Sequence, residues 1–229
     1  IYNEIKKQKI ILDVKNWTNT YLKERVKFLI DRDKVNSLKK FPIQPPGLFK
    51  QLRNVIPKNS AITLDAGTLC LQATDALEYY DPPSLFTPLD FGLVGFSFAC
   101  GLGVKIAKPK QTVVSISGDG GFLFNSQELA TATQFGINVI AVVFNDGAYG
   151  NVKRDMKEMF NNKNLGSDLI NPDFIKLADT YGVAGFKADS PELLEESLKK
   201  AIKLNKTALI EVPIGETLSP FIFGVHAAD

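Results

Sequence analysis

The chain has 229 residues, of which 45% are hydrophobic and 23% charged, a composition that predicts a globular protein with one sizeable core. Its formal net charge is only +2, and no long basic stretch is interleaved with aromatic residues, which disfavours nucleic acid as a partner. The longest uncharged apolar run, Phe91 to Val104, contains glycines and is shorter than the roughly 20 residues that span a membrane. With only two cysteines, Cys70 and Cys100, we expect a cytoplasmic protein without a membrane segment.

Residues 1–40 are predicted to be a lead-in, formed by the tail of a preceding domain and a linker, and residues 41–229 the main domain. From Leu48 onward, segments of helical spacing alternate with apolar runs. We expect helices near Leu48–Val55, Gly95–Ile106, Ser126–Phe135, Asp173–Tyr181 and Pro191–Leu204, and strands near Ala61–Asp65, Thr112–Ser117, Val139–Phe144 and Ala208–Val212. Apolar strands separated by helices predict a three-layer α/β/α fold around a parallel sheet.

Three polar segments directly follow predicted strands. They are Ala66-Gly67-Thr68, Gly118-Asp119-Gly120-Gly121, and the segment from Asn145 to Gly150. In an open parallel sheet, ligands bind beyond the carboxyl ends of the strands. We therefore expect the three segments to line one rim of the sheet and to form the binding site.

The residue types on this rim indicate an anion held through a metal ion. Glycines 118, 120 and 121 let the backbone turn sharply and approach a phosphate closely before the next helix begins. Asp119 lies among these glycines, and Asp146 follows 27 positions later on the same rim. Carboxylates beside a phosphate suit Mg²⁺, with the backbone carbonyl of Ala148 as a third oxygen ligand.

Gly118-Asp119-Gly120, followed after 24 residues by Asn145-Asp146, resembles the signature of thiamine diphosphate enzymes. Further segments are similar, in the same order, to the acetolactate synthase, pyruvate oxidase and benzoylformate decarboxylase group: Phe41-Pro42-Ile43-Gln44-Pro45, Asp65-Ala66-Gly67, Gly92-Leu93-Val94-Gly95-Phe96, Gln127-Glu128-Leu129, Asp173-Phe174 and Ala208 to Pro213. The resemblance covers about 190 residues, from Phe41 onward. It implies a thiamine diphosphate-binding fold with thiamine diphosphate and Mg²⁺ as cofactors.

The resemblance also assigns the metal ligands. Asp119 takes the place of the family's metal-binding aspartate, and Asp146 stands where the second ligand is most often asparagine. The neighbouring Asn145 is the less favoured ligand. The second carboxylate adds negative charge beside a diphosphate, so the resemblance implies a true divalent cation.

The remaining cofactor contacts follow from the same resemblance. Gly67 and Thr68 correspond to the edge that contacts the diphosphate, although Thr68 also suits an ordinary turn. Gly92 corresponds to the residue whose carbonyl accepts a hydrogen bond from the aminopyrimidine. Val94 corresponds to the apolar wedge between the cofactor rings, or else it simply packs at the start of a glycine-rich helix. Tyr149, in the metal loop, completes the expected cofactor contacts.

In the family, the activating glutamate comes from a separate pyrimidine-binding domain of the same or a neighbouring subunit. We identify no such residue here, and Ile1 in place of an initial Met suits the C-terminal third of a longer polypeptide. The resemblance implies a homodimeric or homotetrameric enzyme that decarboxylates, ligates or oxidises small 2-keto acids. The isolated chain is then expected to be inactive. The substrate, the acceptor and any FAD in the remaining part are not identified.

Two other functions were weighed. A regulatory or binding module would keep the fold without chemistry, and a nucleotide-binding protein would use the same rim, although neither Gly-x-x-x-x-Gly-Lys-Ser/Thr nor Gly-x-Gly-x-x-Gly is present. Within the family, Asp155 replaces a tryptophan of acetohydroxyacid synthases, which disfavours that activity. Lys153 and Arg154 are interpreted as a solvated helix face in preference to an anion clamp. His226 is not expected to bind metal, and residues 161–171 are expected to form a mobile loop.

Overall fold

The computed structural model describes residues 2–9, 15–36 and 45–216. The chain divides into two compact units, Ile1–Ser37 and Leu38–Asp229. The first contains helices α1 (Tyr2–Lys7) and α2 (Lys15–Asn36), and on α2 the exposed rings of Trp17 and Tyr21 stack at 5.8 Å between centroids. Within the described residues, no helix is both long and apolar enough to cross a membrane. Residues 41–44 and His226 lie outside the described part of the chain.

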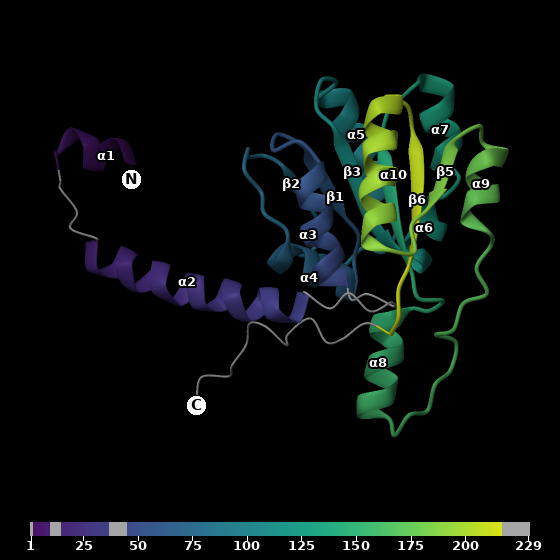
Figure 1. Cartoon of the computed structure of the whole chain (residues 1–229), viewed down its shortest axis with the longest axis horizontal. Coiled ribbons are helices and arrows are strands. Elements are labelled where there is room, and N and C mark those ends of the chain that lie inside the picture. The colour runs from purple at the N-terminus through teal and green to yellow at the C-terminus, as the bar shows by residue number, and fades with distance from the viewer. Residues whose placement is uncertain (1, 10–14, 37–44, 217–229) are drawn as a thin grey trace. The chain divides into compact units, whose positions relative to one another are not determined.

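The second unit is built on a parallel sheet (Figure 1). Its six strands among the described residues are β1 (Ala61–Leu64), β2 (Leu85–Phe86), β3 (Val113–Gly118), β4 (Ile140–Asn145), β5 (Ala184–Lys187) and β6 (Ala208–Pro213), in the order β2-β1-β3-β4-β6-β5. The central strands are apolar throughout because both faces of the sheet are covered, as is usual for all-parallel sheets. The predicted α/β fold with a parallel sheet is confirmed.

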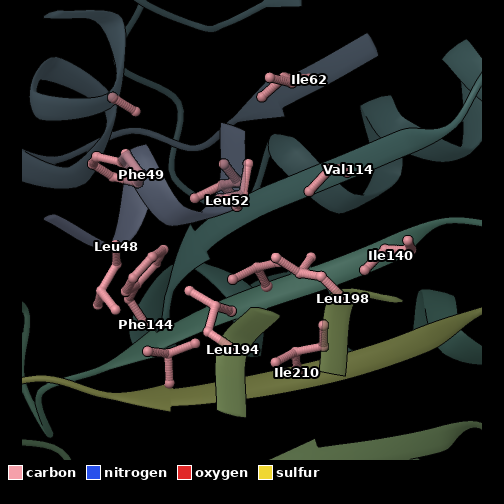
Figure 2. Close-up of a cluster of buried hydrophobic side chains, with 14 of the residues drawn as sticks. Leu48, Phe49, Leu52, Ile62, Val114, Ile140, Phe144, Leu194, Leu198 and Ile210 are labelled. Atoms are coloured by element: carbon pink, nitrogen blue, oxygen red, sulfur yellow. The ribbon is translucent and has the colours of Figure 1, made fainter. Parts of the chain in front are cut away.

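Alternate residues of the central strands face two separate clusters of buried side chains. On one face, α3 (Pro45–Val55), α4 (Thr68–Ala76) and α10 (Pro191–Leu204) pack over Ile140, Val142 and Phe144 of β4. Figure 2 shows leucines of α3 and α10 meeting above the strands in this cluster. On the other face, α5 (Ser97–Ala107), α6 (Asp119–Asn125), α7 (Glu128–Phe135) and α9 (Phe174–Thr180) pack over Ala141 and Val143. The result is three layers.

Local sequence signals set several helix ends. Ser190 caps α10 by accepting a hydrogen bond from the Leu193 amide at 3.2 Å, Pro191 occupies its first position, and Asn205 ends it in the left-handed conformation. Asp173 caps α9 in the same way through the amides of Ile175 and Lys176. The predicted helices and strands therefore lie within a few residues of the observed ones.

One helix stands apart from this core. Helix α8 (Gly150–Met159) follows β4 and has no buried residues. In Figure 1 it lies below the layered part of the unit, beyond the carboxyl ends of the strands. Its side chains are therefore available to whatever occupies that edge of the sheet.

Candidate cofactor site

The three polar segments that follow β1, β3 and β4 meet in one cavity of about 340 Å³ at the carboxyl edge of the sheet. Its lining includes Ala66, Gly67, Thr68, Leu69, Gly92, Val94, Gly118, Asp119, Gly120, Gly121, Asp146, Ala148, Tyr149, Gly150, Asn151 and Val152. Every residue predicted from the sequence to contact the cofactor is in this set. The volume lies within the range of small-molecule sites.

Glycines 120 and 121 are needed because a side chain would not fit there, and not because the backbone turns sharply. This corrects the explanation predicted from the sequence. Helix α6 already begins at Asp119, so these glycines lie in its first turn, and neither has a positive φ. A Cβ on Gly120 would lie 2.5 Å from Cε1 of Tyr149, and one on Gly121 would lie 2.8 Å from Oδ1 of Asp65. Side chains here would collide with the walls that surround the cavity.

Asp119 is almost completely buried, at 1% exposure. Its Oδ2 accepts hydrogen bonds from the Gly147 amide at 2.9 Å and from Nδ2 of Asn171 at 2.5 Å, and its Oδ1 accepts one from the Gly120 amide at 2.9 Å. Burial raises the pKa of this carboxyl, while the hydrogen bonds from Asn171, Gly120 and Gly147 act in the opposite direction. Asp119 is thus held rigidly as an acceptor.

Asp146 places a second carboxylate in the same cavity, where its Oδ1 accepts a hydrogen bond from the Ala148 amide at 3.2 Å. Burial, followed by the negative charge of Asp119, raises the pKa of Asp146 to about 6. Two carboxylates that oppose each other's ionisation favour a cation between them. Among the described residues, no group of three Cys, His, Asp or Glu side chains gathers as a metal site, so any third protein ligand is of another type.

Asn145, the less favoured ligand, makes contacts on the side of Asp119 and β6. Its Nδ2 donates to Oε1 of the buried Glu211 at 2.8 Å. Its Oδ1 accepts from the Gly147 amide at 3.1 Å and from Nδ2 of Asn171 at 2.9 Å. Within this network it orients the loop after β4, and Asp146 is the side chain that lines the cavity.

Sequence reasoning missed Asn171, which links Asp119 to Asn145. It lies at the end of the segment predicted to be a mobile loop, yet that segment is tied back to the site. The Leu169 amide donates to the Gly147 carbonyl, and the Tyr149 amide to the Ser167 carbonyl, both at 2.8 Å. The side-chain Oδ1 of Asn171 is buried without a hydrogen-bond partner. Pro172, which follows it and favours an extended conformation at the preceding residue, was the only local signal.

Asp65 is a second residue whose structural role was not predicted from the sequence. Its Oδ1 accepts hydrogen bonds from the amides of Ala66 and Gly95, and its Oδ2 from the amide of Ser97, all at 2.9 Å. The buried carboxylate thereby fixes the end of β1 to the segment that carries Gly92 and Val94 at the cavity wall. The position after a strand was visible in the sequence, but its partners come from distant segments.

Another part of the cavity wall is formed by Gly67 and Thr68. Gly67 has a φ of +103°, which favours glycine, and it precedes α4 without a side-chain cap. Next to it, Thr68 is buried. Its hydroxyl accepts a hydrogen bond from Nη1 of Arg154 at 3.0 Å. The side chain of Arg154 is only 12% exposed, so the solvated-face interpretation is wrong for this residue, whereas Lys153 on the same helix is 41% exposed.

Several other polar residues do not line the cavity. Tyr79 donates to the Ala73 carbonyl at 3.1 Å, and Tyr80 lies beside the guanidinium of Arg53. Glu128 accepts a hydrogen bond from Thr131 on α7. Within the described residues, no glutamate lines the cavity.

The profile of the family described as "Thiamine pyrophosphate enzyme, C-terminal TPP binding domain" matches residues 65–212, well over half of the chain. The chain belongs to this thiamine pyrophosphate enzyme family. All residues that line the cavity fall within the matched segment. The resemblance noted from the sequence is therefore confirmed.

Named relatives agree with this assignment. The chain is 36% identical over 180 residues to the probable acetolactate synthase large subunit of Methanocaldococcus jannaschii, covering 76% of this chain and 30% of that protein. It is 29% identical over 170 residues to the acetolactate synthase of Bacillus subtilis, covering 74% and 30%. The solved thiamine diphosphate-dependent 4-hydroxybenzoylformate decarboxylase of Rhodococcus jostii RHA1 is 26% identical with a TM-score of 0.71, covering 76% and 33%. The chain thus spans about a third of the length of these relatives.

Proposed function

We propose that the cavity binds the diphosphate of thiamine diphosphate through a divalent metal ion, within a larger enzyme that acts on 2-keto acids. Asp119, Asp146 and the Ala148 carbonyl are the proposed metal ligands. Gly67, Thr68 and the segment from Gly118 to Gly121 surround the diphosphate. Gly92, Val94 and Tyr149 contact the rest of the cofactor.

The chemistry of the site fits such a metal. Two carboxylates and a carbonyl are hard oxygen donors, which Mg²⁺ prefers, and Mg²⁺ usually keeps several water ligands. The hydrogen bonds from Asn171, Gly120 and Gly147 hold the Asp119 carboxylate in place as one of these donors. The glycines of α6 leave room for the phosphates, since a Cβ at either position would meet the cavity walls.

When bound, the cofactor supplies a carbanion that adds to the keto carbon and stabilises the charge left by decarboxylation. The residues of this chain bind and orient it. Asp119 and Asp146 hold the metal, and the Gly92 carbonyl accepts a hydrogen bond from the aminopyrimidine. Val94, which is 41% exposed at the cavity wall, would pack against the rings of the bound cofactor.

The observation that carries this proposal is the convergence of Asp119 and Asp146 in one glycine-lined cavity at the end of the sheet. Calorimetric titration of the full chain with thiamine diphosphate, ATP and NAD, each with and without Mg²⁺, tests it. We expect metal-dependent binding of thiamine diphosphate alone. Tighter binding of ATP or NAD would instead support a nucleotide-binding protein.

We further propose that a pyrimidine-binding domain, of the same or a neighbouring subunit, covers the face that carries Phe91, Leu93 and Val94, all of which are exposed. That domain would supply the activating glutamate, and the assembly would be a homodimer or homotetramer. Addition of a pyrimidine-binding domain from a relative should restore turnover. A regulatory module would bind the cofactor and stay inactive in that experiment.

Two of the relatives above are named acetolactate synthases. Asp155, on α8, stands where acetohydroxyacid synthases place a tryptophan, and its side chain is 48% exposed. We propose a decarboxylase, another carboligase or an oxidase in preference to an acetohydroxyacid synthase. Efficient formation of 2-acetolactate by the complete enzyme would contradict this preference.

A further inference from the structure

Arg154 is a half-buried cation beside the proposed diphosphate site. It projects from α8, and its side chain is only 12% exposed. Nη1 donates to Oγ1 of Thr68 at 3.0 Å, and Nη2 donates to Oδ1 of Asn151 at 2.5 Å. Thr68 and Asn151 both line the cavity. The guanidinium thus lies directly behind two polar residues of the cavity wall.

The donors of Arg154 fix how those two residues face the ligand. A guanidinium only donates, so the amide oxygen of Asn151 must face it, and the hydroxyl of Thr68 donates its single proton to the same oxygen at 3.2 Å. The Nδ2 amide group of Asn151 then remains as its donor toward the cavity. Arg154 therefore fixes Asn151 with its amide donor free, next to a positive charge.

The charge of Arg154 is only weakly offset, because its carboxylate partner is largely exposed to solvent. The carboxylate that pairs with it is Asp155, at a distance of 3.6 Å with its side chain 48% exposed. The adjacent Lys153 is instead bonded to Asp168 at 2.6 Å in an exposed pair. A divalent cation offsets only the charges of Asp119 and Asp146, so the diphosphate itself needs a further cation.

We infer that Arg154 is a positioning residue for the cofactor's diphosphate: together with Thr68 it fixes the amide oxygen of Asn151, which leaves Nδ2 of Asn151 to donate to a phosphate oxygen, and it supplies the positive charge that the second carboxylate, Asp146, makes necessary. This inference rests on the proposed function. A phosphate close to a guanidinium that is partly shielded from water interacts with it more strongly than in bulk solvent, and hydrogen bonds to charged groups exceed neutral ones in strength.

The test measures binding of inorganic pyrophosphate and of thiamine diphosphate to the full chain in the presence of Mg²⁺ by calorimetry. Loss of a charge-assisted interaction predicts that Arg154→Gln raises both dissociation constants at least about tenfold. The matched control Lys153→Gln removes the same charge one residue away and should change them less than about threefold, as expected for an exposed pair. Arg154→Lys keeps the charge and should recover part of the affinity.

A purely structural role for Arg154 predicts a different pattern. Because α8 has no buried residues, Arg154→Gln should fold, which circular dichroism checks. Thr68→Val, on a separate helix, removes the hydroxyl and should also weaken pyrophosphate binding. Unchanged affinity in Arg154→Gln and Thr68→Val would overturn this inference, and so would an equal loss of affinity in Lys153→Gln. Either result leaves the proposed function standing. If the unmodified chain binds neither ligand with Mg²⁺, the proposed function fails as well.

Discussion

Asp119 joins the buried hydrogen-bond network to the cavity, so its removal should affect ligand binding directly. In Asp119→Ala we expect retention of both Mg²⁺ and thiamine diphosphate to be lost, because Asp146 alone cannot hold the cation between protein and diphosphate. Equilibrium dialysis followed by metal and cofactor analysis measures this. Glu196→Ala, which removes an exposed carboxylate on α10, serves as the control. Undiminished retention in Asp119→Ala would exclude it as a ligand.

Asn171 orients Asp119 without lining the cavity. Outer partners of metal ligands are typically worth about 10- to 100-fold in metal affinity, so we expect a loss of that size in Asn171→Ala. Competition with a magnesium indicator dye measures it. Asn138→Ala, before the opposite end of β4, should leave the affinity unchanged. A loss in both variants would point to general destabilisation.

Asp146 makes a prediction about pH in the metal-free chain. Its pKa is raised from 3.8 to about 6 on folding, so the folded state holds the proton more tightly and stability falls as pH rises through this window. Asp146→Asn should therefore stabilise the apo chain at pH 7 by at most about 3 kcal/mol, with no gain below about pH 4. Urea unfolding with EDTA at both pH values checks this. An equal gain at both values would exclude ionisation of Asp146 as the cause.

At the scale of elements, α6 can lie close to Asp65, at the end of β1, because Gly121 has no side chain. In Gly121→Ala the new Cβ would lie 2.8 Å from Oδ1 of Asp65, which three backbone hydrogen bonds prevent from moving. We expect a loss of about 1–3 kcal/mol in the free energy of unfolding. Urea denaturation measures it.

Gly103 in α5 provides the matched control for that substitution. A Cβ there meets no atom within 4 Å. Gly103→Ala should stabilise the chain by about 0.5–1 kcal/mol through the helix propensity of alanine. If the two substitutions had the same effect, close contact with Asp65 would not be the reason for glycine at position 121.

The elements with strong periodicity were predictable, and so was the rim that they form. Long apolar runs such as Val139–Phe144 and the capped helix from Pro191 require nothing beyond local sequence. The two-residue strand β2 and the half-exposed β5 lack such a pattern. The contacts of Asn171 and Arg154 were also not predictable, because they join segments that lie 52 and 86 residues apart in sequence.

For the whole molecule, we expect the purified chain to fold but to be catalytically silent. Within the described residues no glutamate lines the cavity. General acid–base catalysis by such a residue is typically worth ~10²–10⁴-fold in rate. Release of carbon dioxide from pyruvate with thiamine diphosphate and Mg²⁺ measures activity. Turnover at rates normal for the family would show that an activating carboxylate is present in this chain.

We expect the purified chain to self-associate through the face that carries Phe91, Leu93 and Val94. Phe91 is 87% exposed, and beside Leu93 an apolar groove of about 620 Å³ runs along α5. Exposed apolar patches of this kind mark interaction surfaces. Sedimentation velocity over a range of concentrations should show association that Phe91→Ser weakens. A strictly monomeric chain would contradict the prediction.

The hydrogen bonds of Asp65 have a consequence for the kinetics of ligand entry. Because one buried carboxylate fixes the segment of Gly95 and Ser97 and also limits the position of Gly121, two walls of the cavity are ordered before any ligand arrives. Binding then incurs little loss of backbone entropy, since those residues are already restricted. Association should accordingly follow a single exponential whose rate rises linearly with ligand concentration, without a slow ordering step.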